Sequence, residues 1–349
     1  MIERTLEARI VRLGRTLGFS AVGIADIALE REAAGFQAWI EAGQHGEMEY
    51  MARHGAKRWQ PDSLQPGTQS VICVALDYWS NAAADADETL AAPERAYISR
   101  YALGRDYHKV LRNKLQGFAE AISTQIAAHE FRVFTDSAPV MEIPLAVKAG
   151  LGWRGKHTLL LNRERGSMFF LGEIYTSLKL APPQPQNDHC GSCSACIDVC
   201  PTQAITAPHR LDARKCISYL TIELKTAIPV EFRKAMGNRI YGCDDCQLVC
   251  PWNKFAQRTP IPDFEPRHGL DAAMLVELFA WTEADFNERL QGSAIRRIGH
   301  ERWLRNIAVA LGNAPSSPTV TVALRARDGH PSALVREHVA WALAQHAAL

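Results

Sequence analysis

Eight of the nine cysteines lie between His189 and Pro251, and their spacing constrains this chain more than any other feature. The first run reads CxxCxxCxxxCP, the second reads CxxCxxxCP, and a single cysteine stands between them. The first spacing is that of bacterial ferredoxins, in which a tight loop places three thiolates around one face of a [4Fe–4S] cluster. Eight thiolates provide two sets of four ligands, so the sequence predicts two clusters.

The fourth cysteine of a ferredoxin run binds the cluster of the other run. This crossover assigns to the first cluster the residues Cys190, Cys193, Cys196 and Cys250. It assigns to the second cluster the residues Cys200, Cys216, Cys243 and Cys246. Proline follows Cys200 and Cys250. Because proline has no amide hydrogen and a fixed φ, we expect it to end the short helix that carries each of these cysteines.

Paired cysteines have other uses, which this spacing disfavours. CxxC pairs also form tetrahedral Cys₄ zinc sites. Zinc, however, has no need for a third cysteine at the same two-residue interval, or for a repeated CxxxCP ending. A disulfide framework is disfavoured further, because disulfides are rare in the reducing compartment that the next features indicate.

The rest of the composition is ordinary for a cytoplasmic protein. The first residues, MIERTLEARIVRLGRTLGF, are charged throughout and lack the apolar segment of a signal peptide. No later run reaches the ~18 apolar residues of a membrane span. We therefore expect a cytoplasmic location and no membrane contact. The net charge of +1 argues against wholesale binding of polyanions, but it allows a local basic face.

The chain of 349 residues is long enough for two or three domains. A proline-rich linker, residues 181–187, leads into the cysteine segment, and three further prolines mark the exit from it. We therefore predict three domains, which span residues 1–180, 181–262 and 263–349.

Helical intervals and short apolar stretches predict the elements of the first domain. The predicted helices span residues 6–17 and 109–129, and the predicted strands span residues 21–27, 70–78 and 131–134. Residues 166–180 form either a pair of strands or one long bent strand, and residues 81–93 are predicted to be a surface loop. Cys73, inside the second strand, is interpreted as a small core residue.

Asp136 follows the strand 131–134 and is a candidate for a ligand site. Ligands bind at strand ends in α/β sheets, so an acid there can be functional, but it can equally cap the next turn. The pattern alone gives the two interpretations equal weight. The loop 151–162 contains Gly and Lys without the GxxxxGK[ST] spacing of a phosphate loop, and no GxGxxG follows a strand. A nicotinamide-binding fold therefore has no support.

The last part of the chain is predicted to be helical. Residues 303–313 and 335–345 share the pattern small-apolar-small-Leu, which favours a short HEAT-like helical repeat with two copies. A basic run precedes and enters the first copy, and it contains Arg289, Arg296, Arg297, His300, Arg302 and Arg305. Such a run is usually a solvated helix face. The sharper interpretation is a phosphate-binding patch on a helical repeat.

Two clusters in a larger chain predict an electron relay. A relay needs a terminal acceptor, and the first 180 residues are the only part large enough to hold one. We therefore expect a one-electron conduit into a cofactor or substrate near Asp136 and the loop at Gly155.

At this point the chain resembles a known family, the cobalamin-dependent epoxyqueuosine reductases, which perform the last step of queuosine formation in tRNA. The resemblance covers nearly the whole chain in order. Its motifs are ISRYALGRDYH, TDSAPVMEIPLAVKAGLGWRGKHTLLLN, GSMFFLGEI, both cysteine runs with CISYLTIE, and LRNIAVALGN. The cysteine runs are shared by many enzymes, whereas the first two motifs are far more specific.

The resemblance implies an α+β fold with three parts: an N-terminal cobalamin domain similar to that of reductive dehalogenases, a ferredoxin-like domain with two [4Fe–4S] clusters, and a C-terminal HEAT-like domain. Cobalamin is bound without an axial histidine in the family. This agrees with the broken DxHxxG signature, which Asp106 and His108 begin but in which Leu111 replaces the glycine.

The resemblance also implies the site residues. Asp136 corresponds to the proposed proton donor. The implied surroundings of cobalamin are Arg58, Ser99, Arg100, Tyr101, Asp136, Ser137, Ala138, Lys156, His157, Thr158, Leu171 and Ser218. The candidates for gripping the phosphates of the tRNA anticodon loop are Lys225, Arg296, Arg297, His300 and Arg302.

The implied chemistry is consistent with these parts. Conversion of an epoxide into an alkene takes two electrons and two protons, and reduced cobalt supplies a nucleophile or reductant that no side chain can. We expect Asp136 to be protonated near neutrality, because an apolar cofactor pocket raises the pKa of a carboxyl group. An external low-potential electron donor is implied as a partner, and a monomer is expected.

Two other functions fit the sequence less well. A corrinoid enzyme that reduces a small organohalide would have no reason to add a basic helical domain, and respiratory enzymes of that kind usually carry a twin-arginine export signal. A non-catalytic electron carrier or tRNA-binding scaffold does not explain the SRYxxGxDYH and DSAP motifs.

Overall fold

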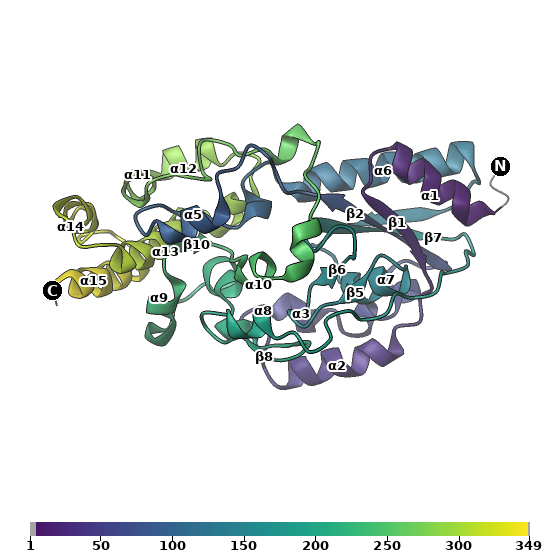
Figure 1. Ribbon diagram of the computed structural model, residues 1–349, viewed down its shortest axis with the longest axis horizontal. Coiled ribbons are helices and arrows are strands. Elements are labelled where there is room, and N and C mark those ends of the chain that lie inside the picture. Colours follow the sequence, from purple (N-terminus) through teal and green to yellow (C-terminus); the bar gives the residue numbers. More distant parts are fainter. Residues whose placement is uncertain (1–4, 348–349) are drawn as a thin grey trace.

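A four-stranded antiparallel sheet forms the centre of the first half of the chain (Figure 1). The computed structural model describes residues 5–347. The strands of this sheet, in spatial order, are β1 (Ala21–Ala25), β2 (Ser70–Asp77), β7 (Phe169–Thr176) and β4 (Phe131–Phe134). The shorter strands are β3 (Tyr97–Ile98), β5 (Trp153–Arg154), β6 (Leu160–Leu161), β8 (Ile205–Ala207), β9 (Arg210–Leu211) and β10 (Arg239–Tyr241).

Helices surround this sheet and make up the C-terminal part. They are α1 (Leu6–Thr16), α2 (Glu30–Glu41), α3 (Glu49–Arg53), α4 (Pro61–Leu64), α5 (Ala86–Ala91), α6 (Tyr107–Gln125), α7 (Glu142–Lys148), α8 (Ala195–Asp198), α9 (Val230–Met236), α10 (Asp245–Leu248), α11 (Leu275–Ala280), α12 (Glu283–Arg289), α13 (Gly299–Asn313), α14 (Pro318–Arg325) and α15 (Ala333–Ala347). Two single-turn segments matter for the site, the π-helical η4 (Tyr219–Glu223) and the 3₁₀-helical η7 (Ala294–Ile298).

The central strand β2 explains why the sheet has two apolar faces. Every residue of β2 is buried, and successive side chains point to opposite faces of the sheet. Ile72 and Val74 pack in the core that α1 and α6 cover, whereas Val71 and Cys73 pack in the core that α7 covers. Cys73 is therefore a fully buried core residue, as predicted.

Most predicted elements of the first domain are present, with shifted ends. The helix predicted from residue 109 begins at Tyr107, because the Asp106 side chain caps it by accepting the amide of His108. Residues 166–180 contain one strand, β7, rather than a pair. The predicted surface loop 81–93 is wrong in part, because Asp85 accepts the amides of Asp87 and Glu88 and so caps the short helix α5.

One strip of the first half, the strand β3 with the preceding Ala96, packs with the C-terminal helices. Strand β3 pairs in parallel with β10 of the cysteine segment, and the Ala96 amide donates to the Ala273 carbonyl at 2.8 Å. Ile98 belongs to the same apolar core as Trp303 and most of the buried apolar residues of α13 and α15. The strip thus joins the sheet domain, the cysteine segment and the helical part into one packed unit.

The two helices with the shared pattern, α13 and α15, pack against each other, and α14 lies between them in sequence. Within the described residues, no helix is both long and apolar enough to cross a bilayer.

Candidate active site

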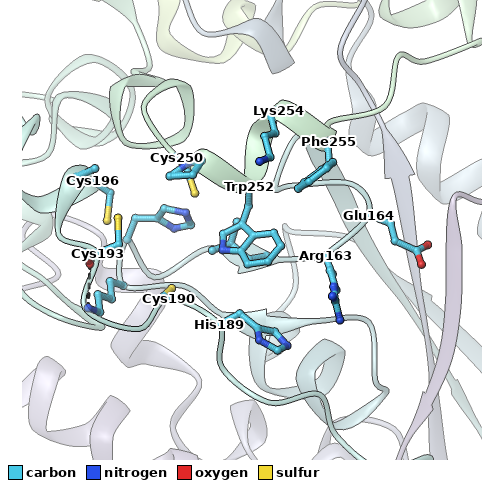
Figure 2. A pocket seen from close by; sticks show the side chains of 15 residues that line it. Arg163, Glu164, His189, Cys190, Cys193, Cys196, Cys250, Trp252, Lys254 and Phe255 are labelled. Atoms are coloured by element: carbon cyan, nitrogen blue, oxygen red, sulfur yellow. Dashed lines mark hydrogen bonds between the residues drawn. The ribbon is translucent and has the colours of Figure 1, made fainter.

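The first predicted set of cysteines surrounds a cavity of about 790 Å³ near the surface (Figure 2). Its lining includes Cys190, Cys193, Cys196 and Cys250. Lys156 ties the loop of this set by donating to the carbonyls of Gly191 at 2.6 Å and Cys193 at 2.9 Å. The indole N–H of Trp153 donates to the Cys190 sulfur at 3.5 Å, which is the kind of bond that stabilises a ligating thiolate.

The second predicted set lies along an inner cavity of about 410 Å³. Its lining includes Cys200, Cys216, Cys243 and Cys246. The amide of Ala204 donates to the Cys200 sulfur at 3.2 Å. The structure thus brings together the two sets of four that the crossover predicts. Within residues 5–347, no three His, Cys, Asp or Glu side chains are placed to hold a single metal ion.

The helices that precede the last cysteines end earlier than expected. Helix α8 ends at Asp198 and α10 ends at Leu248, so Cys200 and Cys250 lie just outside them. The prolines that follow therefore do not end these helices. Proline favours an extended backbone at the residue before it, and Cys250 has a ψ of +122° directly before Pro251, which begins a short 3₁₀ helix.

A larger cleft of about 1160 Å³ adjoins the inner cavity. The two linings share residues from several elements, and these are Asp136, Glu142, Ile143, Thr158 and Leu211. The inner cavity and the cleft therefore meet at these residues, and together they form a path from the second set of cysteines to Asp136.

Asp136 occupies a constrained loop at the floor of the cleft. Its φ is +49°, a left-handed conformation that non-glycine residues rarely adopt, and its amide donates to the Glu142 carboxylate at 2.7 Å. The Tyr107 hydroxyl donates to the Asp136 carboxylate, and His108 Nε2 lies 3.2 Å from the same oxygen. The Asp136 side chain is 54% exposed, so it is open to a molecule in the cleft.

These contacts correct the expected ionisation of Asp136. Burial alone would raise its pKa, but hydrogen bonds from His108 and Tyr107 and the charges of His108 and Arg297 lower the pKa below its ordinary value. The expectation of a protonated Asp136 is therefore wrong for the free protein. A proton that leaves from Asp136 must first be delivered to it.

His108 is placed to deliver such a proton. Its Nδ1 lies 2.8 Å from Asp106 Oδ1, and this contact orients the ring toward Asp136. Burial lowers the pKa of His108, but hydrogen bonds to Asp106 and Asp136 and the charge of Asp136 outweigh burial and raise it overall. The two carboxylates on either side of the ring favour its charged form, and the charge of Arg297 opposes it.

Two buried acids lie behind this group. Burial and the charge of Asp136 raise the pKa of Glu142 to about 8. Burial and the charge of Glu142 raise the pKa of Glu173 well above its ordinary value. Because two adjacent buried carboxylates resist ionising together, at least one of them stays protonated near neutrality.

The residues implied for cobalamin divide among three places. The cleft is lined by Arg58, Asp136, Ser137, Ala138 and Thr158. The inner cavity is lined by Ser99, Tyr101, Leu171, Ser218 and His157. Lys156 lies instead at the first cysteine cavity, and Arg100 lines neither the cleft nor the inner cavity.

Ser99 and Arg100 also support the second set of cysteines. The Ser99 hydroxyl and the Arg100 amide donate to the buried carboxylate of Asp244, at 2.5 and 2.8 Å. Asp244 lies between Cys243 and Cys246 in sequence. The structure therefore assigns Ser99 and Arg100 a role in fixing this loop.

His157 is buried with one ring nitrogen unused. Its Nδ1 accepts the amide of Leu159 at 3.2 Å, and its Nε2 has no partner among the described residues. Burial lowers the pKa of His157 to about 4, so the ring is neutral at physiological pH.

The basic residues implied for tRNA are dispersed. Lys225 and Arg296 are exposed. Arg302 donates to the carbonyls of Ile298 and Ile222, and His300 Nε2 lies 2.9 Å from the Trp281 carbonyl oxygen. These contacts give Arg302 and His300 structural partners of their own.

Arg297 reaches into the cleft. Its Nη2 donates to Asp106 Oδ2 at 2.8 Å, and its Nη1 lies 3.0 Å from His108 Nε2. Half of its side chain, 52%, remains exposed. Arg297 thus belongs to the acid and histidine group around Asp136, a contact that the basic run alone does not indicate.

Arg305 does not belong to any phosphate-binding face, although the basic run contains it. It is fully buried, and it donates to the carbonyls of Leu224, Thr226 and Leu220 at 2.7 to 2.8 Å. The positively charged side chain therefore satisfies the carbonyl groups in and after η4 from inside the protein.

We expect Arg305→Ala to destabilise the fold. Three carbonyl groups would be left without their donor, and an unsatisfied buried polar group costs about 1–3 kcal/mol, so the loss of stability should be on the order of 3 kcal/mol or more. Urea unfolding of the cluster-loaded protein under anaerobic conditions measures it, with the exposed Arg296→Ala as control. A loss of stability equal to that of the control would contradict the structural role.

Sequence reasoning missed three residues of the site. His108 was considered only as part of a broken cobalamin signature, and Glu142 and Glu173 were not singled out. All three lie in the motifs ISRYALGRDYH, TDSAPVME and GSMFFLGEI, so a signal for them was present. Their mutual contact depends on tertiary structure.

Comparisons with known proteins agree with this site. Residues 189–253 match the family model described as a 4Fe-4S double cluster binding domain, and residues 58–137 match the model of epoxyqueuosine reductase QueG. The epoxyqueuosine reductase of Pseudomonas aeruginosa is 58% identical over 334 residues, which cover 95% of this chain and 92% of the relative. The chain belongs to the epoxyqueuosine reductase family. The Escherichia coli epoxyqueuosine reductase is 56% identical over 97% of this chain and 89% of its own length.

Solved structures of epoxyqueuosine reductases have the same fold. One, with an epoxyqueuosine-modified tRNA-Tyr stem loop, is 28% identical, has a TM-score of 0.88 and aligns over 98% of this chain and 90% of its own. Another, from Bacillus subtilis, is 29% identical with a TM-score of 0.85 over the same shares, and its catalytic aspartate loop is swung out of the active site. The cysteine segment of this epoxyqueuosine reductase family member is a double [4Fe–4S] domain.

Proposed function

We propose that this protein reduces epoxyqueuosine to queuosine at the wobble position of tRNA. The observation that carries the proposal is the cleft at Asp136, which a lined path connects to the second set of cysteines. Relatives at 56–58% identity over nearly the whole chain are named for this activity. No observation favours the reduction of a small organohalide.

The cleft and the inner cavity fit a corrinoid. Together they offer a large space with an apolar wall at Leu171 and the unpartnered Nε2 of buried His157. The residues that would hold cobalamin are Arg58, Ser99, Tyr101, Ser137, Ala138, His157, Thr158, Leu171 and Ser218. Cobalamin, when bound, supplies the reducing cobalt centre that opens the epoxide.

The side chains of this protein supply protons and position. Asp136 faces the cleft and gives a proton to the epoxide oxygen as its C–O bond breaks. Tyr107 and His108 hold the Asp136 carboxylate in place, and Glu142 holds the backbone of the same loop. Arg58 also supports the lining of the cleft, because its guanidinium donates to the carbonyls of Met51 and Tyr50 at 2.9 and 2.7 Å.

Electrons enter through the first cluster in this proposal. Cys193 is exposed, whereas the second set of cysteines lies along the inner cavity. An external low-potential donor would therefore reduce the cluster held by Cys190, Cys193, Cys196 and Cys250. The cluster held by Cys200, Cys216, Cys243 and Cys246 would pass the electrons on to the cleft.

The finer organisation is part of the same proposal. We interpret the packed helices α13 and α15 as a HEAT-like unit, and we keep the three domains 1–180, 181–262 and 263–349 as a division of the sequence. A cytoplasmic monomer suits an enzyme whose substrate is tRNA.

The direct test is nucleoside mass spectrometry. tRNA that carries epoxyqueuosine is incubated anaerobically with the purified protein, cobalamin and a strong reductant. Conversion to queuosine only when cobalamin is present is the expected result. Untouched tRNA, with both clusters and cobalamin bound, would refute the proposed function.

The tRNA interface can be tested through salt dependence. For each phosphate that the protein no longer binds, the slope of log K against log salt concentration should fall by about 1. We expect the double variant Lys225→Gln/Arg296→Gln to flatten this slope for an anticodon stem loop. Arg15→Gln is the matched control, because α1 lies at the far end of the molecule from α13 (Figure 1). An unchanged slope in the double variant would assign both residues to a solvated surface.

A further inference from the structure

One nitrogen of His108 has two competing partners. Nε2 lies 3.2 Å from Asp136 Oδ2 and 3.0 Å from Arg297 Nη1. A carboxylate needs a hydrogen on this nitrogen, whereas a guanidinium N–H needs a lone pair there. Both contacts cannot be hydrogen bonds at the same time.

The conflict defines two states of the site. In the first, His108 is neutral, its Nδ1–H donates to Asp106, and its Nε2 accepts from Arg297. In the second, His108 is charged, Nδ1–H still donates to Asp106, and Nε2–H donates to Asp136. Asp106 serves both states, so at a given pH the choice depends on whether Arg297 occupies the second partner position of Nε2.

The half-exposed side chain of Arg297 is placed to exchange its partners. Its side chain is 52% exposed, it lines the cleft, and it comes from η7 rather than from the sheet domain. Its backbone is fixed, because Arg302 donates to the Arg297 carbonyl at 3.1 Å. A guanidinium in such a position can exchange Asp106 and His108 for a phosphate, which it binds with two parallel hydrogen bonds.

We infer that Arg297 couples substrate binding to proton delivery. A backbone phosphate of the bound RNA draws the guanidinium away from His108, and the ring then takes the charged state that faces Asp136. Arg297 is thus a positioning residue that acts through His108, and this inference rests on the proposed function.

The other groups that face His108 support this coupling. Asp106 and Tyr107 lie on the same turn, Asp136 lies in the loop after β4, and Glu142 on α7 faces Asp136 from behind. Arg297 is the cation among the groups that perturb His108, and its charge lowers the pKa of His108 against the acids that raise it. Withdrawal of this cation therefore favours the charged ring.

The proton transfer is balanced. The Nε2–H bond of His108 breaks and an O–H bond forms at Asp136 Oδ2, and no electron moves. Asp136 then gives this proton to the epoxide oxygen, and His108 regains a proton from solvent. Without RNA, the contact with Arg297 favours the neutral state of His108, so fewer molecules hold a proton ready for Asp136.

The test compares two pH profiles of the holoenzyme. The dependence of kcat/KM on pH reports groups of the free enzyme, and that of kcat reports the RNA complex. Activity requires charged His108, so it is lost as pH rises through the pKa of this residue. For the wild type, we expect this loss at higher pH in kcat than in kcat/KM. In Arg297→Gln the two losses should coincide at the higher pH.

Arg296→Gln is the matched control. It removes a neighbouring exposed cation that bonds Asn287 rather than His108, so the separation of the two profiles should remain even if KM rises. Coincident profiles in the wild type, or separate profiles in Arg297→Gln, would overturn the inference.

A second readout does not depend on turnover. Carbon-13 NMR of labelled histidine follows the titration of His108, which a His108→Gln variant assigns. An unmodified anticodon stem loop should move this titration to higher pH in the wild type but not in Arg297→Gln. If the RNA binds without moving it, the coupling is absent. If epoxyqueuosine is not reduced but the titration moves, the proposed function fails, whereas the coupling between RNA binding and His108 is confirmed.

Discussion

Asp136→Asn should reduce turnover of epoxyqueuosine roughly 10²- to 10⁴-fold, the usual contribution of a general acid. Asparagine keeps the shape of the side chain and an oxygen that accepts from Tyr107, but it cannot take a proton from His108 and pass it on. Because the loop is held by the Asp136 amide and Glu142, the variant should keep its conformation. Single-turnover rates with prereduced enzyme measure the effect on chemistry rather than on electron supply.

The control for this substitution is Asp263→Asn, which removes only an exposed ion pair with Arg105. Iron and cobalamin contents of both variants should equal those of the wild type. Wild-type turnover in Asp136→Asn would remove Asp136 from the mechanism. Loss of cobalamin from it would instead assign the carboxylate to cofactor binding.

Cys216→Ala should remove about half of the iron and abolish turnover, because it removes one ligand of the second [4Fe–4S] cluster and leaves the first cluster intact. Cys193→Ala should also remove about half of the iron, from the first cluster. The two variants differ in what survives. A strong small reductant that enters the cleft should restore some single turnovers to Cys193→Ala, in which the cluster next to the cleft remains.

Cys73→Ala is the control for both cysteine variants. Cys73 is fully buried in β2 opposite Glu173 of β7, and it belongs to neither set of four. The Cys73→Ala variant should therefore keep all of its iron. Full iron content in Cys216→Ala would show that Cys216 is not a ligand, and the crossover assignment would then have to change.

The features that could be predicted from the sequence depend on local spacing. The spacing of the cysteines predicts the two sets of four ligands, because ferredoxin loops are short and their geometry follows from the spacing. The apolar run 70–78 predicted β2 as a buried strand, and Asp85 and Asp106 are caps that their position before a helical pattern could have indicated.

Other features depend on tertiary contacts, which the spacing of residues along the sequence does not predict. His108 lies in the first turn of α6 and Asp136 follows β4, and they meet because β7 places β4 near that helix. The basic run suggested one face, but Arg305 points into the protein while Arg297 points into the cleft. The ionisation of Asp136 was expected from an apolar pocket, and the neighbouring donors reverse it.

The pairing of β3 with β10 has a consequence for how this chain can be divided. Ile98, Ile240 and Leu304 share one apolar core, although they lie in three different predicted domains. A chain shortened before residue 263 would expose that core in both remaining parts. The catalytic, cluster and helical parts are therefore expected to unfold together, and a swap of one part between distant relatives should fail unless the strip around β3 is exchanged with it.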